Sequence, residues 1–254
     1  LTNSKTERWI TGKSFDLFVG SHDGYSQLAS PVRHRRWIFS LQSGFYLIRD
    51  LAQGKGKHRL DVTWHLGPEM QLRAEHLFEV KGSSRGLAVL CAEGHGWSEE
   101  VRQETWSPVY GKREPVTVLN FRSVTNLPAE FVTLLVPLEE ARGIPGKLMQ
   151  VSEKTATRVK EYLYSTPSEE FSFFFAERGR QWNQGRVASD AEFVCWQRKH
   201  AGEDELLIFC NGSYVEIDGN RVLGFKQTIS DCEMRSRAGG NEVHSSQPEL
   251  TSCS

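Results

Sequence analysis

The stretch from His22 to Pro68, HDGYSQLASPVRHRRWIFSLQSGFYLIRDLAQGKGKHRLDVTWHLGP, decides the fold of this chain. Two runs rich in aromatic and β-branched residues, 36–41 and 45–51, flank the turn Gln42-Ser43-Gly44, and this pattern predicts a β-hairpin. From His58 to Leu66 apolar and polar residues alternate with a period of two. That alternation is typical of a strand with one buried and one accessible face. The stretch therefore predicts antiparallel strands.

The same pattern continues through most of the chain. One short helix is expected from Glu139, and the Gly143-Ile144-Pro145-Gly146 sequence ends it within two turns. Asp218-Gly219 between two alternating runs predicts a tight hairpin. Further strands are expected at 15–19, 71–79, 86–93, 114–124, 131–137, 158–164, 170–176, 191–199, 206–210 and 213–217. We therefore expect an all-β fold, a large antiparallel multi-sheet sandwich of the supersandwich type with little helix.

The domain organisation follows from the same runs. Apolar strand patterns on both sides of residues 137–158 favour one continuous sandwich over residues 1–231, and a division into two domains near 137–158 is the alternative. From Cys232 to Ser254 polar residues, Gly and Pro dominate, so that we expect a disordered tail over 232–254.

Composition excludes several classes of protein. The 254 residues are 38% hydrophobic, and Lys+Arg 31 against Asp+Glu 32 gives a net charge of -1, which indicates no nucleic-acid or membrane partner. No run approaches the ~18 apolar residues of a transmembrane helix, and residues 1–14 are too polar for a signal peptide. The five cysteines are odd in number and lack zinc-type spacing, so we predict no disulfide scaffold and no metal site, although a Cys195–Cys210 bridge stays open.

Motifs of familiar enzymes are missing too. There is no GxSxG serine motif, the segment from Gly54 to Lys57 is interpreted as a hairpin turn instead of a phosphate loop, and no pair of carboxylates stands out as catalytic. Four histidines, His22, His34, His58 and His65, fall at strand ends or on a polar strand face. Strand pairing could bring them together, with Asp23 and Asp50 orienting their rings, but solvated or structurally satisfied side chains are the alternative. The other four histidines, His76, His95, His200 and His244, have no partner nearby in the sequence.

The opening stretch resembles the C-terminal β-sandwich region of the heparinase II/III-like polysaccharide lyases, and the similarity extends more loosely to about residue 225. The matching residues are the His22-Asp23-Gly24-Tyr25 tetrad, the His34-Arg35-Arg36 run, the Asp50-Leu51 strand end, the turn from Gly54 to His58 and the final Trp64-His65-Leu66-Gly67-Pro68. The resemblance implies an enzyme with an N-terminal α/α toroid followed by this sandwich. It also implies cleavage of uronic-acid-containing glycans by β-elimination, in a periplasmic or secreted location.

By the same resemblance, the catalytic Tyr and Asn come from the toroid. A Gly-His-x-His-x-Asp-type motif at the start of the sandwich serves catalysis and a structural metal, and the further metal ligands also precede the matched region. This chain lacks that motif. We therefore assign it no catalytic residue, metal ligand or cofactor, and interpret it as the C-terminal part of a lyase whose partner is the missing toroid.

The substrate-binding residues that we predict are His34, Arg35, Arg36, His22 and Asp23. Their basic groups would contact an acidic polysaccharide such as a glycosaminoglycan or alginate through charge-assisted hydrogen bonds. The alternative function is a non-catalytic carbohydrate-binding or scaffold sandwich, in which some of the tryptophans stack on sugar rings while the others, Trp37 and Trp64 among them, lie in the core.

Overall fold

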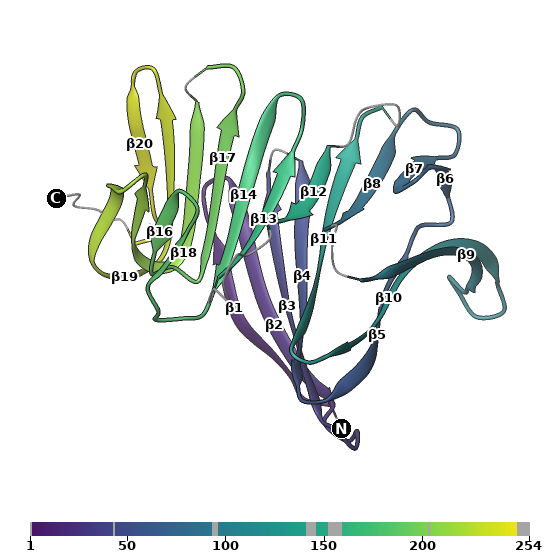
Figure 1. Cartoon of the computed structure of the whole chain (residues 1–254). Helices are drawn as coiled ribbons and strands as arrows, with labels where there is room; N and C mark the ends of the chain where they lie inside the picture. Colours follow the sequence, from purple (N-terminus) through teal and green to yellow (C-terminus); the bar gives the residue numbers. More distant parts are fainter. Residues whose placement is uncertain are drawn as a thin grey trace. The chain divides into compact units, whose positions relative to one another are not determined.

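The structure is a computed structural model that describes residues 2–42, 44–92, 96–140, 146–151, 159–202 and 204–247. Within these residues the regular elements are all strands, which confirms the all-β, multi-sheet, antiparallel prediction (Figure 1). The strands are β1 Ser4–Thr11, β2 Phe15–Tyr25, β3 Val32–Leu41, β4 Phe45–Gly54, β5 Lys57–His65, β6 Met70–Ala74, β7 Leu77–Val80, β8 Gly86–Cys91, β9 Ser98–Trp106, β10 Glu114–Asn126, β11 Ala129–Leu138, β12 Lys147–Gln150, β13 Val159–Ser165, β14 Glu169–Ala176, β15 Trp182–Gln184, β16 Val187–Ser189, β17 Phe193–Lys199, β18 Glu205–Ile217, β19 Asn220–Arg237 and β20 Gly240–His244.

The chain forms two compact units. Unit 1 comprises Leu1–Trp9 and Leu17–Pro145, and unit 2 comprises Ile10–Asp16 and Gly146–Ser254. In the part of the chain that the structure describes there is no helix with the length and apolar composition needed to cross a bilayer.

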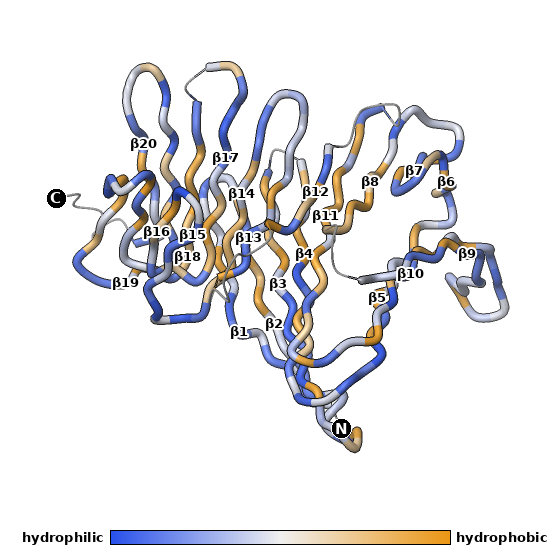
Figure 2. Tube along the Cα trace, viewed as in Figure 1, coloured by the Kyte–Doolittle hydropathy of each residue, from blue (hydrophilic) through white to orange (hydrophobic). Residues whose placement is uncertain are grey.

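Unit 1 contains an eight-stranded sheet in the order β1-β2-β3-β4-β11-β8-β7-β6 and a three-stranded sheet in the order β5-β10-β9. The predicted hairpin of β3 and β4 is present, with Leu41 paired to Phe45. Hydrophobic residues concentrate along β4, β8 and β11 (Figure 2), because these central strands are covered on both faces.

A bent two-stranded ribbon connects the two sheets of unit 1. β4 pairs with β11 in the larger sheet, and β5 pairs with β10 in the smaller one, so both strands of the ribbon cross at the same corner. Segment 54–57 is therefore not the hairpin turn that we predicted, because β4 and β5 pair with β11 and β10 and not with each other. The corner is held by the Leu127 amide donating to the Gly56 carbonyl at 3.0 Å and by Ser30 Oγ donating to the Lys55 carbonyl at 2.6 Å.

The core of unit 1 next to this corner is aromatic. The ring of Phe131 lies 4.8 Å from Phe121 and 4.5 Å from Trp97, between centroids. Val62 and Trp64 pack against the same cluster from β5, whose exposure alternates residue by residue as predicted. Trp37 is buried elsewhere in unit 1, in agreement with its assignment to the core.

Unit 2 contains a sheet in the order β12-β13-β14-β17-β18-β16-β15, to which β19 and β20 add beyond β18. The predicted Asp218-Gly219 turn joins β18 and β19, and both residues have positive φ, 52° and 77°, as a type I′ turn requires. Cys195 and Cys210 are buried thiols, so the bridge between them does not form.

Some predictions in unit 2 and at its boundary are wrong. Residues 232–237 and 240–244 are strands and not a disordered tail, because Cys232 and Met234 point into the core from a polar sequence. Residues 248–254 lie outside the described residues. Glu139 and Glu140 are not helical, residues 147–150 form β12, and the rest of the expected helix falls largely outside the described residues.

Candidate functional site

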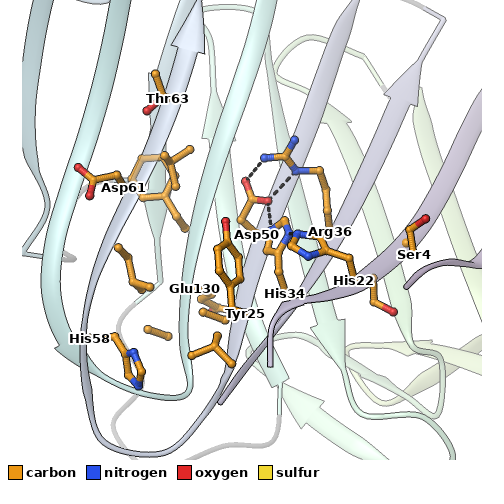
Figure 3. Close-up of a pocket in the computed structure, with 18 of the residues that line it drawn as sticks. Ser4, His22, Tyr25, His34, Arg36, Asp50, His58, Asp61, Thr63 and Glu130 are labelled. Atoms are coloured by element: carbon orange, nitrogen blue, oxygen red, sulfur yellow. Dashed lines mark hydrogen bonds and ion pairs between the residues drawn. The ribbon is translucent and has the colours of Figure 1, made fainter. Parts of the chain in front are cut away.

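A cavity of about 880 Å³ lies within unit 1, where the ribbon bends (Figure 3). One side is lined by residues of β2, β3, β4 and β11, and the other by His58 to Thr63 of β5. The β3 and β4 residues that line it share one face of the sheet, since Arg36 stands directly opposite Asp50 and His34 opposite Ala52. The alternation of the hairpin thus places every second side chain in the cavity.

The centre of the site is a hydrogen-bonded chain of four side chains from three strands. The Nε2 atom of His22 lies 2.9 Å from Nδ1 of His34, and Nε2 of His34 lies 2.7 Å from Oδ1 of Asp50. Arg36 donates from Nε to Oδ1 of Asp50 at 2.6 Å and from Nη2 to Oδ2 at 3.0 Å. Asp50 therefore orients both a guanidinium and an imidazole, and the second of these roles is one of the two alternatives that the sequence left open for it.

The protonation of this chain follows from its contacts. Burial acts most strongly on Asp50 and alone would raise its pKa, but the hydrogen bonds and charges of His34 and Arg36 together hold the pKa below the usual aspartate range. Burial, and then the charges of His34 and Arg36, lower the pKa of His22, although Asp23 opposes them. At neutral pH Asp50 is therefore an anion and His22 is neutral.

Two predicted substrate-binding residues lie elsewhere. Arg35 is on the opposite face of β3, where its Nε donates to Glu7 at 2.6 Å and its guanidinium lies 4.1 Å from the Trp37 ring centroid. Asp23 lies in β2, where its carboxylate accepts hydrogen bonds from the backbone and side-chain nitrogens of Asn3 at 2.7 and 2.9 Å. Neither residue lines the cavity.

The β5 side of the cavity carries charge of both signs. Asp61 accepts hydrogen bonds from Arg59 at 2.8 Å and Arg122 at 2.7 Å. Burial opposes ionisation of Asp61, but these bonds and that from Asn120 prevail and lower its pKa to about 2. His58 also lines the cavity, whereas His65 does not and lies 3.7 Å from Glu104.

Sequence reasoning did not select Tyr25 as a site residue. Its phenol lies at the cavity, half exposed, with the ring centroid 5.4 Å from that of His22 (Figure 3). The sequence feature that could have indicated Tyr25 is the His22-Asp23-Gly24-Tyr25 tetrad. On an extended strand, however, such a motif does not by itself show which side chains face a cavity.

Some of the remaining histidines have partners from distant parts of the chain, contrary to their isolation in the sequence. His76 bonds to Glu99, with Cys91 close by, and Nε2 of His244 lies 2.7 Å from Nζ of Lys13. Within the cavity, both ring nitrogens of His34 are engaged, one by His22 and the other by Asp50, so His34 has no ring nitrogen left to hold a metal ion. His95 lies outside the described residues.

Solved structures with a similar fold include a heparan sulfate lyase and a heparinase. Heparan sulfate lyase HepC from Pedobacter heparinus matches with a TM-score of 0.53 and 16% identity over 64% of this chain and 26% of that one. A heparinase III matches with a TM-score of 0.50 and 14% identity over 78% of this chain and 28% of that one. The chain thus spans about a quarter of the length of these enzymes. No curated protein sequence matches it significantly.

The sequence itself matches the family model described as heparinase II/III-like, C-terminal, over residues 3–159. This match covers more than half of the chain and includes every strand that lines the cavity. The chain therefore belongs to the heparinase II/III-like family of polysaccharide lyases, of which it carries the C-terminal region.

Proposed function

We propose that this chain is the β-sandwich part of a lyase that cleaves uronic-acid-containing glycans by β-elimination, and that the unit 1 cavity forms part of the substrate cleft wall. Membership of the heparinase II/III-like family and the fold shared with heparan sulfate lyase HepC support the proposal. An acidic polysaccharide is the substrate class, and a periplasmic or secreted location is expected with it.

The observation that carries the proposal is the orientation of Arg36. Asp50 occupies Nε and Nη2 of the guanidinium, and no hydrogen bond within the described residues occupies Nη1. The side chain is 39% exposed at the cavity, so Nη1 can donate to a carboxylate or sulfate group of a glycan. The guanidinium also lies 5.9 Å from the ring centroid of Trp64 on β5, a cation–π contact that helps to position it.

The chemistry assigns this chain a binding role. β-Elimination needs a base for the proton next to the uronate carboxyl group and donors that stabilise the developing charge. By the family resemblance, we expect the base and the neutralising residue to come from a helical toroid outside this chain. Within this chain, Arg36 would hold an acidic group of the glycan, since a preorganised cation loses little entropy when it binds an anion. His34 and His22 line the same cavity and are already hydrogen-bonded to each other.

A binding measurement tests the proposal. We expect the chain to bind heparan sulfate or another uronate-containing glycan, with an affinity that falls as salt rises. Arg36→Gln should weaken binding about 5- to 50-fold, because one charge-assisted contact is lost. The matched control is Arg33→Gln, on the same strand but the other face, where the guanidinium bonds to Glu7 at 2.7 Å and to Ser21.

Two outcomes would contradict the proposal. Equal loss of affinity in the two arginine variants would show that overall charge, and not the cavity, determines binding. Salt-insensitive binding to neutral and acidic glycans alike would instead favour the alternative, a carbohydrate-binding module whose exposed aromatic side chains, Trp9, Trp106 and Tyr110, stack on sugars.

A further inference from the structure

A second cluster of chemically active side chains lies in unit 1 outside the cavity. His76 comes from the turn between β6 and β7, Cys91 ends β8, and Glu99 is near the start of β9. One ligand atom of each residue lies within 4.8 Å of the others. None of the three lines the cavity, and nothing in the proposed function requires them.

The backbone holds His76 in a demanding conformation. Ala74 pairs with Leu77, so Glu75 and His76 form a two-residue turn in which His76 has a φ of 58°. Such a φ is uncommon for a residue other than glycine. The His76 carbonyl accepts a hydrogen bond from the Val89 amide at 2.9 Å, and this contact fixes the turn against β8.

The side chain of His76 is directed toward the other sheet of unit 1. It hydrogen-bonds to Glu99 through Nε2, and its ring lies 6.4 Å from the ring of Phe121, which is the register partner of Glu99. Cys91 is a thiol on the larger sheet, paired in register with Thr133. The three ligand atoms therefore meet where β8 and the β6–β7 turn face β9.

We propose that His76, Cys91 and Glu99 form a zinc site that joins the two sheets of unit 1. Thiolate, imidazole and carboxylate are the ligands that zinc prefers, at about 2.0–2.3 Å. A tetrahedral ion at those distances would place its ligands ~3.5 Å apart, so side-chain shifts of about 1 Å would complete the site. A neutral imidazole with two anionic ligands balances the charge of Zn²⁺.

The exposure of the site suits a solvent-accessible fourth position. The side chains of His76 and Glu99 are 22% and 28% exposed, so a water molecule can complete the tetrahedron. Three protein ligands with one water are typical of zinc sites that keep an open position. The ion would act as a cross-link, because its ligands come from segments separated along the chain and it binds the folded state alone.

Cobalt substitution tests the site directly. The reduced, metal-stripped chain is titrated with Co²⁺ and then with Zn²⁺. We expect about one equivalent of Co²⁺ to produce a near-ultraviolet thiolate charge-transfer band and visible bands of tetrahedral cobalt, which Zn²⁺ abolishes. Zinc should also raise the melting temperature of the chain.

Variants assign the signal to these residues. Cys91→Ser should abolish the charge-transfer band, and Glu99→Gln and His76→Asn should each weaken binding at least about tenfold. Asn is chosen because it tolerates positive φ. Glu100→Gln, the adjacent residue on the other face of β9, is the matched control and should leave affinity unchanged.

Other thiols do not complicate the assignment within the described residues, because Cys195, Cys210 and Cys232 are at most 1% exposed. The proposal is overturned if the wild-type chain gives no cobalt–thiolate band or if the band survives Cys91→Ser. If the Cys91→Ser variant does not fold, the metal affinity of the Glu99→Gln variant tests the proposal instead. That variant should fold, because the substitution removes only one exposed charge. Unchanged metal affinity in the Glu99→Gln variant would overturn the proposal. His76 and Glu99 would then be an ordinary ion pair beside the Cys91 thiol.

Discussion

Asp50 is the residue on which the geometry of the cavity depends. The residue is 6% exposed, and its carboxylate accepts hydrogen bonds from both His34 and Arg36, so it determines which edge of the Arg36 guanidinium is directed to the ligand. A buried carboxylate is costly unless such partners compensate its desolvation. The orientation of Arg36 and His34 thus depends on Asp50, which itself need not contact the substrate.

Replacing Asp50 should change stability in a pH-dependent way. The folded-state pKa of Asp50 is lowered, so its stabilisation is present above the unfolded-state value of about 3.9 and is lost as the pH falls through the folded-state pKa. We expect Asp50→Asn to lower the free energy of unfolding at pH 7 by about 1–3 kcal/mol and to flatten the acid limb of stability against pH. Urea denaturation between pH 2 and 7 measures both effects. An unchanged acid limb would show that Asp50 is not the group responsible.

His22 predicts the opposite trend for ligand binding. Because its pKa is lowered, His22 is neutral at pH 7, and it gains its positive charge only at a pH below the ordinary histidine pKa of about 6.5. Affinity for an acidic glycan should therefore rise as the pH falls from 7 to 5. The His22→Asn variant should show a smaller rise, with His200→Asn, outside unit 1, as the control. Equal pH profiles for His22→Asn and the wild type would rule out this role.

At the scale of elements, the bent ribbon creates the cavity. Strands β4 and β11 stay in the larger sheet while their continuations β5 and β10 enter the smaller one (Figure 1), and Asn126 still pairs with Lys57 beyond the corner. Phe121 of β10 and Phe131 of β11 lie on either side of the corner and pack together in the aromatic core. Without this corner, β5 could not face β3 across the cavity.

The corner tolerates only glycine at position 54. A Cβ atom added to Gly54 would lie 2.6 Å from the carbonyl oxygen of Pro31, a backbone atom that cannot move alone. We expect Gly54→Ala to destabilise unit 1 by about 1–3 kcal/mol through overpacking and to weaken glycan binding as well. Gly239→Ala, which meets nothing within 4 Å and does not require positive φ, is the control. Thermal denaturation that shows equal stability for the two variants would contradict the assigned close contact.

At the scale of the whole molecule, the family match and the two units divide the chain differently. The match ends at residue 159, whereas unit 2 continues through β13 to β20 and contains the buried aromatic residues of β14, β17 and β18. The cavity and the His76, Cys91 and Glu99 cluster both belong to unit 1.

The isolated chain should bind substrate without cleaving it. The catalytic base and the neutralising residue are expected in the toroid of the parent enzyme, and the chain spans about a quarter of heparan sulfate lyase HepC. We predict no unsaturated product, followed by its ultraviolet absorbance, when the chain is mixed with heparan sulfate, alginate or other uronates. The control is a complete lyase on the same substrates. Robust turnover by this chain would disprove the division of roles.

Much of the fold and part of the candidate site could be predicted from the sequence. Period-two alternation identified β5, and the Asp218-Gly219 dipeptide identified the β18–β19 turn, because both signals are local. The tail prediction from residue 232 was wrong, since a strand of polar composition is stabilised by its neighbours and not by its own residues. Arg35 and Arg36 looked equivalent in the sequence, and only Arg36 faces the cavity.

The sequence by itself determined the β-strands, their alternating faces and the family, because each of these depends on residues that are neighbours in the chain. The tertiary structure alone decided that His22, His34 and Asp50 meet, that β5 pairs with β10 and not with β4, and that His76 lies beside Glu99. Backbone hydrogen bonding between strands is nearly independent of side chains, so the partner of a strand is selected by packing over the whole unit.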